Sequence, residues 1–261
     1  MKRPASPKPA APKPAAPKPA SPTPAVSVAD VRARLRRLAD AKTLAGMSRY
    51  GIPSEGAFGV PVGKIRAYAR ELGCRHALAL ALWKTGQYES RMLACFIADP
   101  GRVTPAVMDA WAKSFDSWAV CDTACFHLFD RTPHAFAKVG KWARSRDEFV
   151  KRAAFALLAS VALHDKDASD EPFIASLTLV ERAASDERNF VKKGVSWALR
   201  AVGRRRSDEL RGRALTLAER LAEAADPAAR WVGRDALRDL SRVRARKTAR
   251  GSATRSRAKA C

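Results

Sequence analysis

Apolar residues recur every three to four positions along most of the chain between residues 27 and 241. In VADVRARLRRLADA (28–41) they are interleaved with arginines at a helical period, which predicts an amphipathic helix. No segment shows the apolar–polar alternation of a half-buried strand. The same periodicity predicts further helices at 62–72, 75–84, 87–98, 104–113, 117–129, 134–144, 147–164, 171–185, 187–202, 208–225 and 227–240. The sequence therefore predicts an all-α fold.

Turn-forming residues separate the predicted helices. Asp226 followed by Pro227 is typical of a helix N-cap and first turn, because aspartate accepts an amide hydrogen bond and proline needs none. Comparable breaks occur at 99–101 and 170–172. Glycines and prolines are so frequent in residues 46–61 that we expect a non-helical joint there.

One predicted helix occurs twice. FVKRAAFALL (149–158) returns 41 residues later as FVKKGVSWAL (190–199). Phe, Val and Leu keep their places in both copies, which indicates a shared core face, and Arg152 is matched by Lys193. A helical repeat of about this length is typical of HEAT and armadillo solenoids, whose stacked helix pairs form one concave face. We therefore expect a HEAT-like solenoid with a concave basic face.

The formal net charge of +23 is spread over three regions. Residues 1–26 carry five Lys or Arg and no acid, residues 242–261 carry eight and no acid, and +10 remains for residues 27–241. The first region is rich in Lys, Pro and Ala, and both ends lack the apolar content that would offset the entropy of ordering. We expect two disordered basic tails, 1–26 and 242–261, around a solenoid of residues 27–241.

This charge balance favours a polyanionic partner, with nucleic acid ahead of membrane. No run of about 18 apolar residues predicts a membrane-spanning helix, and no apolar stretch follows the N-terminal charges as in a secretory signal. The five cysteines are odd in number and their spacing does not indicate a disulfide framework. We interpret them as reduced thiols of a cytoplasmic protein. Cys121, Cys125 and His127 lack a fourth soft ligand at a usual spacing, so buried cysteines are favoured over a zinc site.

Trp118 and Asp122 are the residues that most invite a chemical interpretation, because their i, i+4 spacing puts them on one helix face. A core tryptophan next to a capping aspartate also explains that spacing. The functional interpretation adds Arg152 and Trp197 from the two repeat copies. Aromatic faces attract a planar cation, an arginine binds phosphate, and a carboxylate stabilises developing positive charge.

Short segments of the chain resemble the AlkD-type DNA alkylation repair glycosylases, a family of HEAT-like repeat proteins that act on alkylpurines. The resemblance covers about residues 45–240. It rests on MSRYG (47–51), FGV (58–60), LW (82–83), WAVCD (118–122), SRDEFVKRAA (145–154) and ERNFVKKGVSWALR (187–200).

This resemblance implies hydrolysis of the N-glycosidic bond of cationic alkylpurines, chiefly 3-methyladenine and 7-methylguanine, in double-stranded DNA. By position, Asp122 matches the catalytic carboxylate, and Trp118 and Trp197 match the aromatic pair that flanks the lesion nucleotide. Arg152 matches a backbone contact and Tyr50 a tyrosine near the same cleft. Alkylation already places positive charge on the base, so we expect neither a metal nor a redox cofactor.

Three positions depart from the family pattern: Ala119 stands where the family often has Asp, and Phe149 and Asn189 stand where relatives often carry Trp and Phe. Beyond the matched set, Lys192 and Lys193 are candidate phosphate contacts if the face is concave, and a solvated helix flank is the alternative interpretation. Arg230 could extend the groove together with Arg234 and Trp231. For Trp231, as for Trp83, Trp111 and Trp142, packing in the core is the favoured interpretation.

The sequence leaves three functions open. The first is a monomeric, nucleoid-associated DNA glycosylase in the cytoplasm, with Asp122 as its catalytic residue. The second is a non-catalytic HEAT-like module that binds damaged or branched DNA, which the alanine at position 119 would favour. The third is a solenoid that binds an acidic protein.

Overall fold

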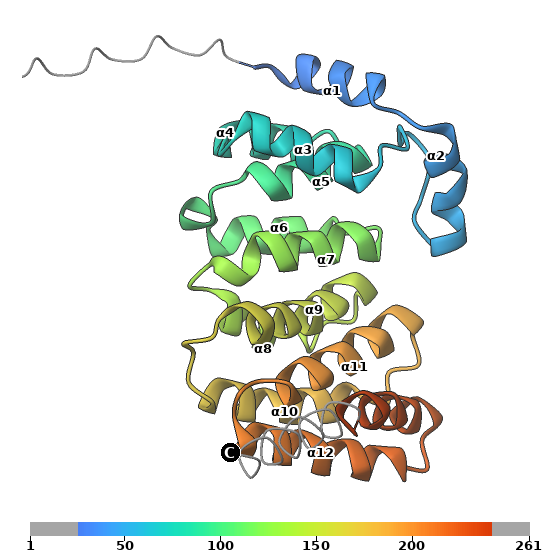
Figure 1. Cartoon of the computed structure of the whole chain (residues 1–261), viewed down its shortest axis with the longest axis vertical. Coiled ribbons are helices and arrows are strands. Elements are labelled where there is room, and N and C mark those ends of the chain that lie inside the picture. Colours follow the sequence, from blue (N-terminus) through green and yellow to red (C-terminus); the bar gives the residue numbers. More distant parts are fainter. Residues whose placement is uncertain (1–25, 242–261) are drawn as a thin grey trace, which may run out of the picture.

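The computed structural model describes residues 26–241, and every regular element in that range is a helix (Figure 1). The predicted all-α class is therefore confirmed. The α-helices are α1 (Val28–Arg37), α2 (Ala41–Met47), α3 (Val62–Leu72), α4 (His76–Trp83), α5 (Tyr88–Ile97), α6 (Pro105–Lys113), α7 (Trp118–His127), α8 (Ala135–Trp142), α9 (Glu148–His164), α10 (Glu171–Ala183), α11 (Asn189–Gly203) and α12 (Asp208–Ala222). Short 3-10 turns are η1 (Ser48–Tyr50), η2 (Pro100–Arg102) and η3 (Phe129–Arg131), and a last helix covers residues 227–241.

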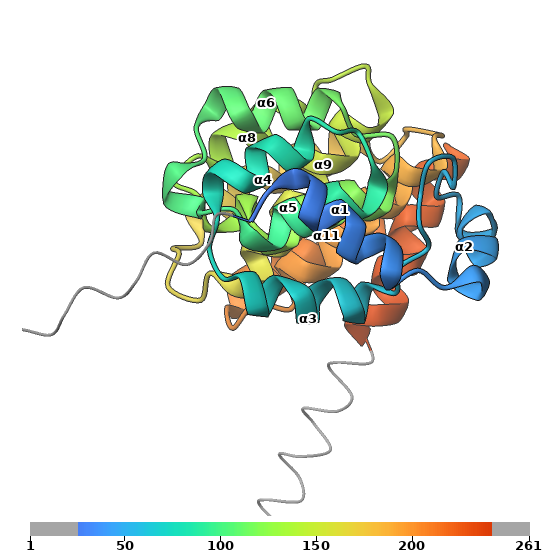
Figure 2. The same cartoon turned by 90° about the horizontal axis from the view of Figure 1, so that it is seen from above.

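From α4 onward the helices form antiparallel pairs that stack along the long axis of the molecule (Figure 1). The second helices of the pairs, α5, α7, α9 and α11, pack against one another in succession. The first helices α8, α10 and α12 form the opposite layer, and Figure 2 shows α4, α6 and α8 on the same side of the stack. This arrangement is the HEAT-like stack that the repeat predicts. The two repeat copies lie on neighbouring helices, α9 and α11.

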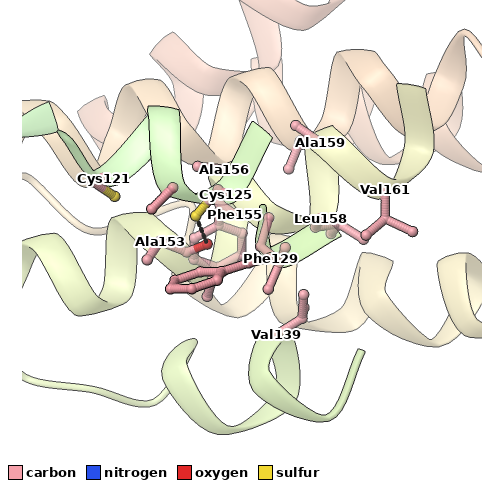
Figure 3. Close-up of a cluster of buried hydrophobic side chains, with 14 of the residues drawn as sticks. Cys121, Cys125, Phe129, Val139, Ala153, Phe155, Ala156, Leu158, Ala159 and Val161 are labelled. Carbon is pink, nitrogen blue, oxygen red and sulfur yellow. Dashed lines mark hydrogen bonds between the residues drawn. The ribbon is translucent and has the colours of Figure 1, made fainter. Parts of the chain in front are cut away.

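Helix α9 is the centre of the core. It is buried from Arg152 to Ala162 because α7, α8 and α11 all pack against it. Five alanines lie in that stretch, and their small side chains let three neighbours approach closely. Figure 3 shows Phe155 of this helix near Phe129 of η3 and Val139 of α8, together with the buried thiols of Cys121 and Cys125 of α7. The interpretation of these two cysteines as buried residues is confirmed.

The tryptophans divide into core and surface residues. Trp83, Trp111 and Trp142 are buried as predicted, and the rings of Trp83 and Trp111 stack with centroids 3.8 Å apart. The prediction for Trp231 is wrong, because 36% of this residue is exposed. Its neighbours on the last helix explain the difference: Val232 and Ala236 occupy the buried face, and Trp231 lies beside that face.

The chain between α1 and α3 also differs from the prediction of one helix over 28–41 followed by a joint. Helix α1 ends at Arg37, and α2 begins after Asp40, whose carboxylate accepts the backbone N–H of Thr43 at 2.8 Å. This N-cap starts a new helix near the end of the segment for which the periodicity predicts one continuous helix. The non-helical joint is thereby shortened to residues 51–61.

A buried carboxylate fixes this shortened joint. Glu89 of α5 is fully buried and accepts the backbone N–H groups of Phe58, Gly59 and Val60, at 3.0, 2.7 and 3.2 Å. Gly59 has φ of +75°, and a Cβ there would lie 2.6 Å from the Cβ of Leu44. The joint therefore packs directly on α2, and only glycine fits at position 59.

No helix in the described part of the chain is long and apolar enough to cross a membrane. The two predicted tails fall almost wholly outside the described residues.

Candidate functional site

A cleft of about 510 Å³ opens where α7, α9 and α11 face η1. Four of the residues singled out in the sequence line it: Tyr50, Trp118, Arg152 and Lys193. They come from four different elements, and their meeting is a consequence of the stacked pairs. The remaining predicted residues, Asp122, Trp197 and Arg230, do not line it.

Trp118 is the first residue of α7, after the N-cap Ser117. Its indole N–H donates to the backbone oxygen of Tyr50 at 2.7 Å, so η1 is tied to α7. On the other side, Gly51 has φ of +67°, and a Cβ there would lie 3.1 Å from the ring of Phe190 on α11. Residues 50 and 51 thus span from α7 to α11 along one side of the cleft, and 65% of Tyr50 is exposed there.

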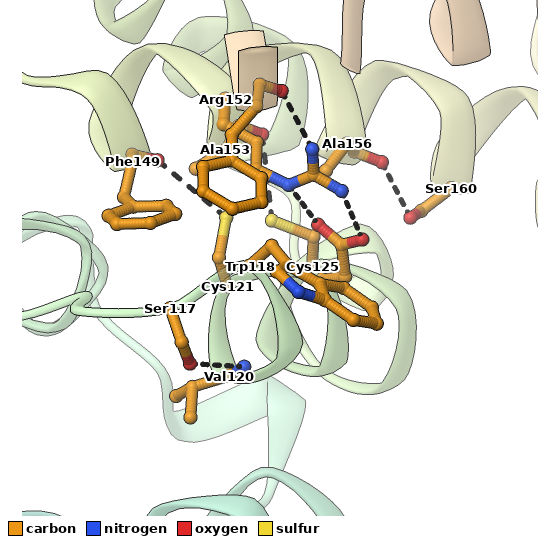
Figure 4. A network of polar contacts seen from close by, with 12 residues as sticks. Ser117, Trp118, Val120, Cys121, Cys125, Phe149, Arg152, Ala153, Ala156 and Ser160 are labelled. Carbon is orange, nitrogen blue, oxygen red and sulfur yellow. Dashed lines mark hydrogen bonds and ion pairs between the residues drawn. The ribbon is translucent and has the colours of Figure 1, made fainter. Parts of the chain in front are cut away.

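Asp122 and Arg152 form a bidentate ion pair between α7 and α9. The guanidinium donates from Nε to Oδ1 at 2.9 Å and from Nη2 to Oδ2 at 2.7 Å. Its third nitrogen, Nη1, donates to the backbone oxygen of Phe190 at 2.7 Å. Figure 4 shows this network beside the ring of Trp118. The side chains are 19% exposed for Asp122 and 8% for Arg152, so the carboxylate lies directly behind the cleft and retains a small accessible surface.

The environment shifts the ionisation of this pair. Burial raises the pKa of the Asp122 carboxyl above its ordinary value, while the charge and hydrogen bonds of Arg152 act in the opposite direction. For Arg152, burial alone would lower the pKa, but Asp122 outweighs it and the pKa is raised. Since a bidentate pair of this geometry needs both charges, we take both groups as ionised at neutral pH.

Aromatic rings flank the guanidinium. The carbon centre of Arg152 lies 6.0 Å from the ring centroids of both Trp118 and Phe190. Phe190 itself packs on Phe149, with ring centroids 5.4 Å apart. Sequence reasoning put these two phenylalanines on the core face, but both are only half-buried, whereas the valines next to them are buried. Each is the second residue of its repeat helix, and this shared place near the helix start was the available signal.

Trp197 lies one turn beyond Lys193 on α11. Its ring is half-buried and stacks near Phe126 of α7, with centroids 6.3 Å apart and an interplanar angle of 24°. The two tryptophans expected to flank one group therefore do not line one cleft. Trp118 faces it, and Trp197 lies further along the layer formed by the second helices of the pairs.

Arg230 belongs to a second cleft, of about 700 Å³, on the last helix. Its Nη2 donates to the backbone oxygen of Ala225 at 2.6 Å. Trp231 lines the same cleft, and Lys192 of α11 places its ammonium 5.1 Å from that indole ring. Lys192 and Lys193 thus direct adjacent positive charges towards the two clefts.

Comparisons with known proteins agree with this architecture. A family model described as "DNA alkylation repair enzyme" matches residues 31–240. A solved structure from "a new family of proteins related to the HEAT-like repeat DNA glycosylases with affinity for branched DNA structures" superposes with a TM-score of 0.67. The two share 21% identity, over 74% of this chain and 82% of that one, so the likeness bears on the fold. None of the curated proteins matches the chain.

Proposed function

The chain belongs to the DNA alkylation repair enzyme family, and on that premise we propose that it is a DNA glycosylase for cationic alkylated purines such as 3-methyladenine and 7-methylguanine. The observation that carries the proposal is the place of Asp122. Its carboxylate lies one helical turn from the indole of Trp118 and behind a cleft lined by Arg152 and Lys193. A cationic base on an anionic backbone suits such a combination of aromatic faces, cations and a carboxylate.

The reaction needs few groups. The bond between the sugar carbon and the base nitrogen breaks, and its electron pair leaves with the base, whose alkyl-derived positive charge is thereby neutralised. The sugar becomes oxocarbenium-like and is captured by water. Asp122 stabilises the positive sugar electrostatically, orients the water and accepts a proton from it.

Excision requires that DNA binding rearranges the ion pair, since all three guanidinium nitrogens of Arg152 are engaged. In this proposal a backbone phosphate competes with Asp122 for the guanidinium. The exchange brings the phosphate against Trp118 and Lys193 and turns the carboxylate towards the sugar. Tyr50 covers the nucleotide from the η1 side, and Trp197 contacts the DNA further along the layer of the second helices. One copy of the chain suffices, with access to the nucleoid in the cytoplasm.

The same ion pair favours a second candidate, a module that binds damaged or branched DNA without excising a base. If Arg152 kept its contacts in the complex, Asp122 would remain neutralised and unable to stabilise the sugar. The solved relative is described by its affinity for branched DNA, which is compatible with this alternative.

Base release in single turnover separates the two. We expect the wild type to release 7-methylguanine from duplex DNA, and Asp122→Asn to slow release at least about 10-fold through loss of one electrostatic stabiliser. Asp116→Asn is the matched control, because Asp116 also pairs with an arginine, Arg91 at 2.9 Å, but is exposed and lies outside the cleft. Absence of release by the wild type with DNA binding retained would replace the glycosylase by the binding module.

A further inference from the structure

We propose that the cleft on the last helix binds unpaired nucleotides of a single-stranded segment that adjoins the duplex in the first cleft. The inference rests on the proposed function, because it assigns a second DNA-binding surface to the same enzyme. Three observations support it: a one-sided row of arginines, an exposed indole, and a lysine pair between the two clefts.

The arginines are Arg230, Arg234 and Arg238, spaced four residues apart and therefore on one face of the helix of residues 227–241. Among the described residues, no acid lines this cleft. Arg238 reaches Asp235 at 3.1 Å, whereas Arg234 is exposed and has no ion-pair or hydrogen-bond partner within residues 26–241. A row of three cations, of which Arg234 has no partner of its own among the described residues, suits the regularly spaced phosphates of a nucleic-acid backbone.

Trp231 supplies the second observation. It is 36% exposed, and it is the only tryptophan within residues 26–241 that is exposed to this extent. An indole beside a row of cations is the arrangement used to bind single strands, in which bases stack on aromatic rings while the groove follows the phosphates. In a duplex, neighbouring pairs cover the faces of each base. We therefore expect the ring of Trp231 to stack on an unpaired base.

The lysine pair joins the clefts. Lys193 lines the cleft of Trp118 and Arg152, and Lys192 lies against the ring of Trp231. A strand that leaves the first cleft past Lys193 therefore meets Lys192, the indole and the arginines in turn. In this inference, the two clefts form one cationic path across the start of α11.

Fluorescence anisotropy with two labelled DNAs tests the inference: a blunt duplex, and the same duplex with a single-stranded arm. We expect Trp231→Ala to weaken binding to the armed DNA at least about 5-fold, as loss of one base–aromatic stack predicts, and to leave the blunt duplex within about 2-fold. Trp231→Phe keeps an aromatic face and should retain most of the binding. Arg234→Ala should weaken binding to the armed DNA and lower the salt dependence of that binding.

Two results would overturn the inference. One is equal weakening of both DNAs by Trp231→Ala while Trp231→Phe behaves as wild type, which would make the helix a duplex contact. The other is unchanged binding of the armed DNA by Trp231→Ala. Neither result depends on excision, which is measured separately by 7-methylguanine release. A chain that never releases a base could still satisfy this test, and an active glycosylase could fail it.

Discussion

Trp118 donates its indole N–H to the backbone oxygen of Tyr50, 68 residues earlier in the chain, at 2.7 Å. Through this hydrogen bond the first residue of α7 holds the 3-10 turn that carries Tyr50 beside the cleft. The same indole lies 6.0 Å from Arg152, so one side chain both positions η1 and covers the ion pair.

Trp118→Phe should separate these two roles. The variant keeps an aromatic ring beside Arg152 but removes the donor to Tyr50, so we expect faster hydrogen exchange at residues 48–52 and a loss of about 1 kcal/mol of local stability. Excision should fall less than in Trp118→Ala, which loses the ring as well. Unchanged exchange at residues 48–52 in Trp118→Phe would show that Gly51 and Phe190 hold η1 without the indole.

Arg152→Ala should destabilise the fold by about 3 kcal/mol, because it leaves the carboxylate of Asp122 uncompensated in a largely buried place. Urea denaturation gives the free energy of unfolding. Adding Asp122→Asn to Arg152→Ala should restore part of the loss, since no buried charge then lacks its partner. If the two substitutions changed the free energy of unfolding additively, the interaction between Asp122 and Arg152 would contribute nothing to stability.

Acidification should switch off excision at a higher pH than an ordinary aspartate would. The ionised Asp122 is the active form, and burial raises the pKa of its carboxyl, so the protonated, inactive form accumulates earlier as the pH falls. A single-turnover pH–rate profile should lose activity on its acidic side, and Asp116→Asn should keep that limb. Asp122→Asn should remove the limb along with most of the activity. A flat profile in the wild type would contradict this assignment.

Gly59→Ala should unfold the joint between α2 and α3. Position 59 combines φ of +75° with contacts closer than 3 Å for any Cβ, so we expect a loss of about 3 kcal/mol or more in thermal or urea unfolding. Gly56→Ala is the control: its φ is +68°, but nothing lies within 4 Å of an added Cβ, and about 1 kcal/mol should be lost. Equal losses of stability at the two positions would contradict this prediction, because the joint would then move to accommodate a Cβ at position 59.

Acid should also weaken the packing between repeats. Burial opposes the ionisation of Asp109, but hydrogen bonds from Lys138, Lys141 and Trp142 outweigh it and lower its pKa to about 2. A carboxyl whose pKa is lowered by folding stabilises the fold at pH values above its pKa in the unfolded chain. That stability is lost as the pH falls towards about 2. Asp109→Asn should therefore lower the melting temperature at neutral pH and flatten its dependence on pH below about 4.

The helices were predictable because their apolar faces repeat with the helical period over ten or more residues, as in α9 and α11. The start of α2 was not, since Asp40 stops one helix and caps another within a continuous amphipathic pattern. The pairing of Asp122 with Arg152 was also hidden. Each residue was identified as part of the candidate site, but their contact depends on the relative rotation of α7 and α9, which the one-dimensional pattern does not carry. The exposure of Trp231 likewise depends on which neighbours complete the last helix pair.

Residues 50 and 51 connect α7 to α11, elements that are two repeats apart. A solenoid changes its curvature through small rotations between successive repeats. A connection across two repeats restricts those rotations locally. The middle of this molecule should therefore be stiff. The pair formed by α12 and the final helix lies beyond the connection made by residues 50 and 51, so it can still rotate relative to its neighbours. If DNA alters the curvature of the protein, the bending should occur at that end, and it would carry Trp231 with it.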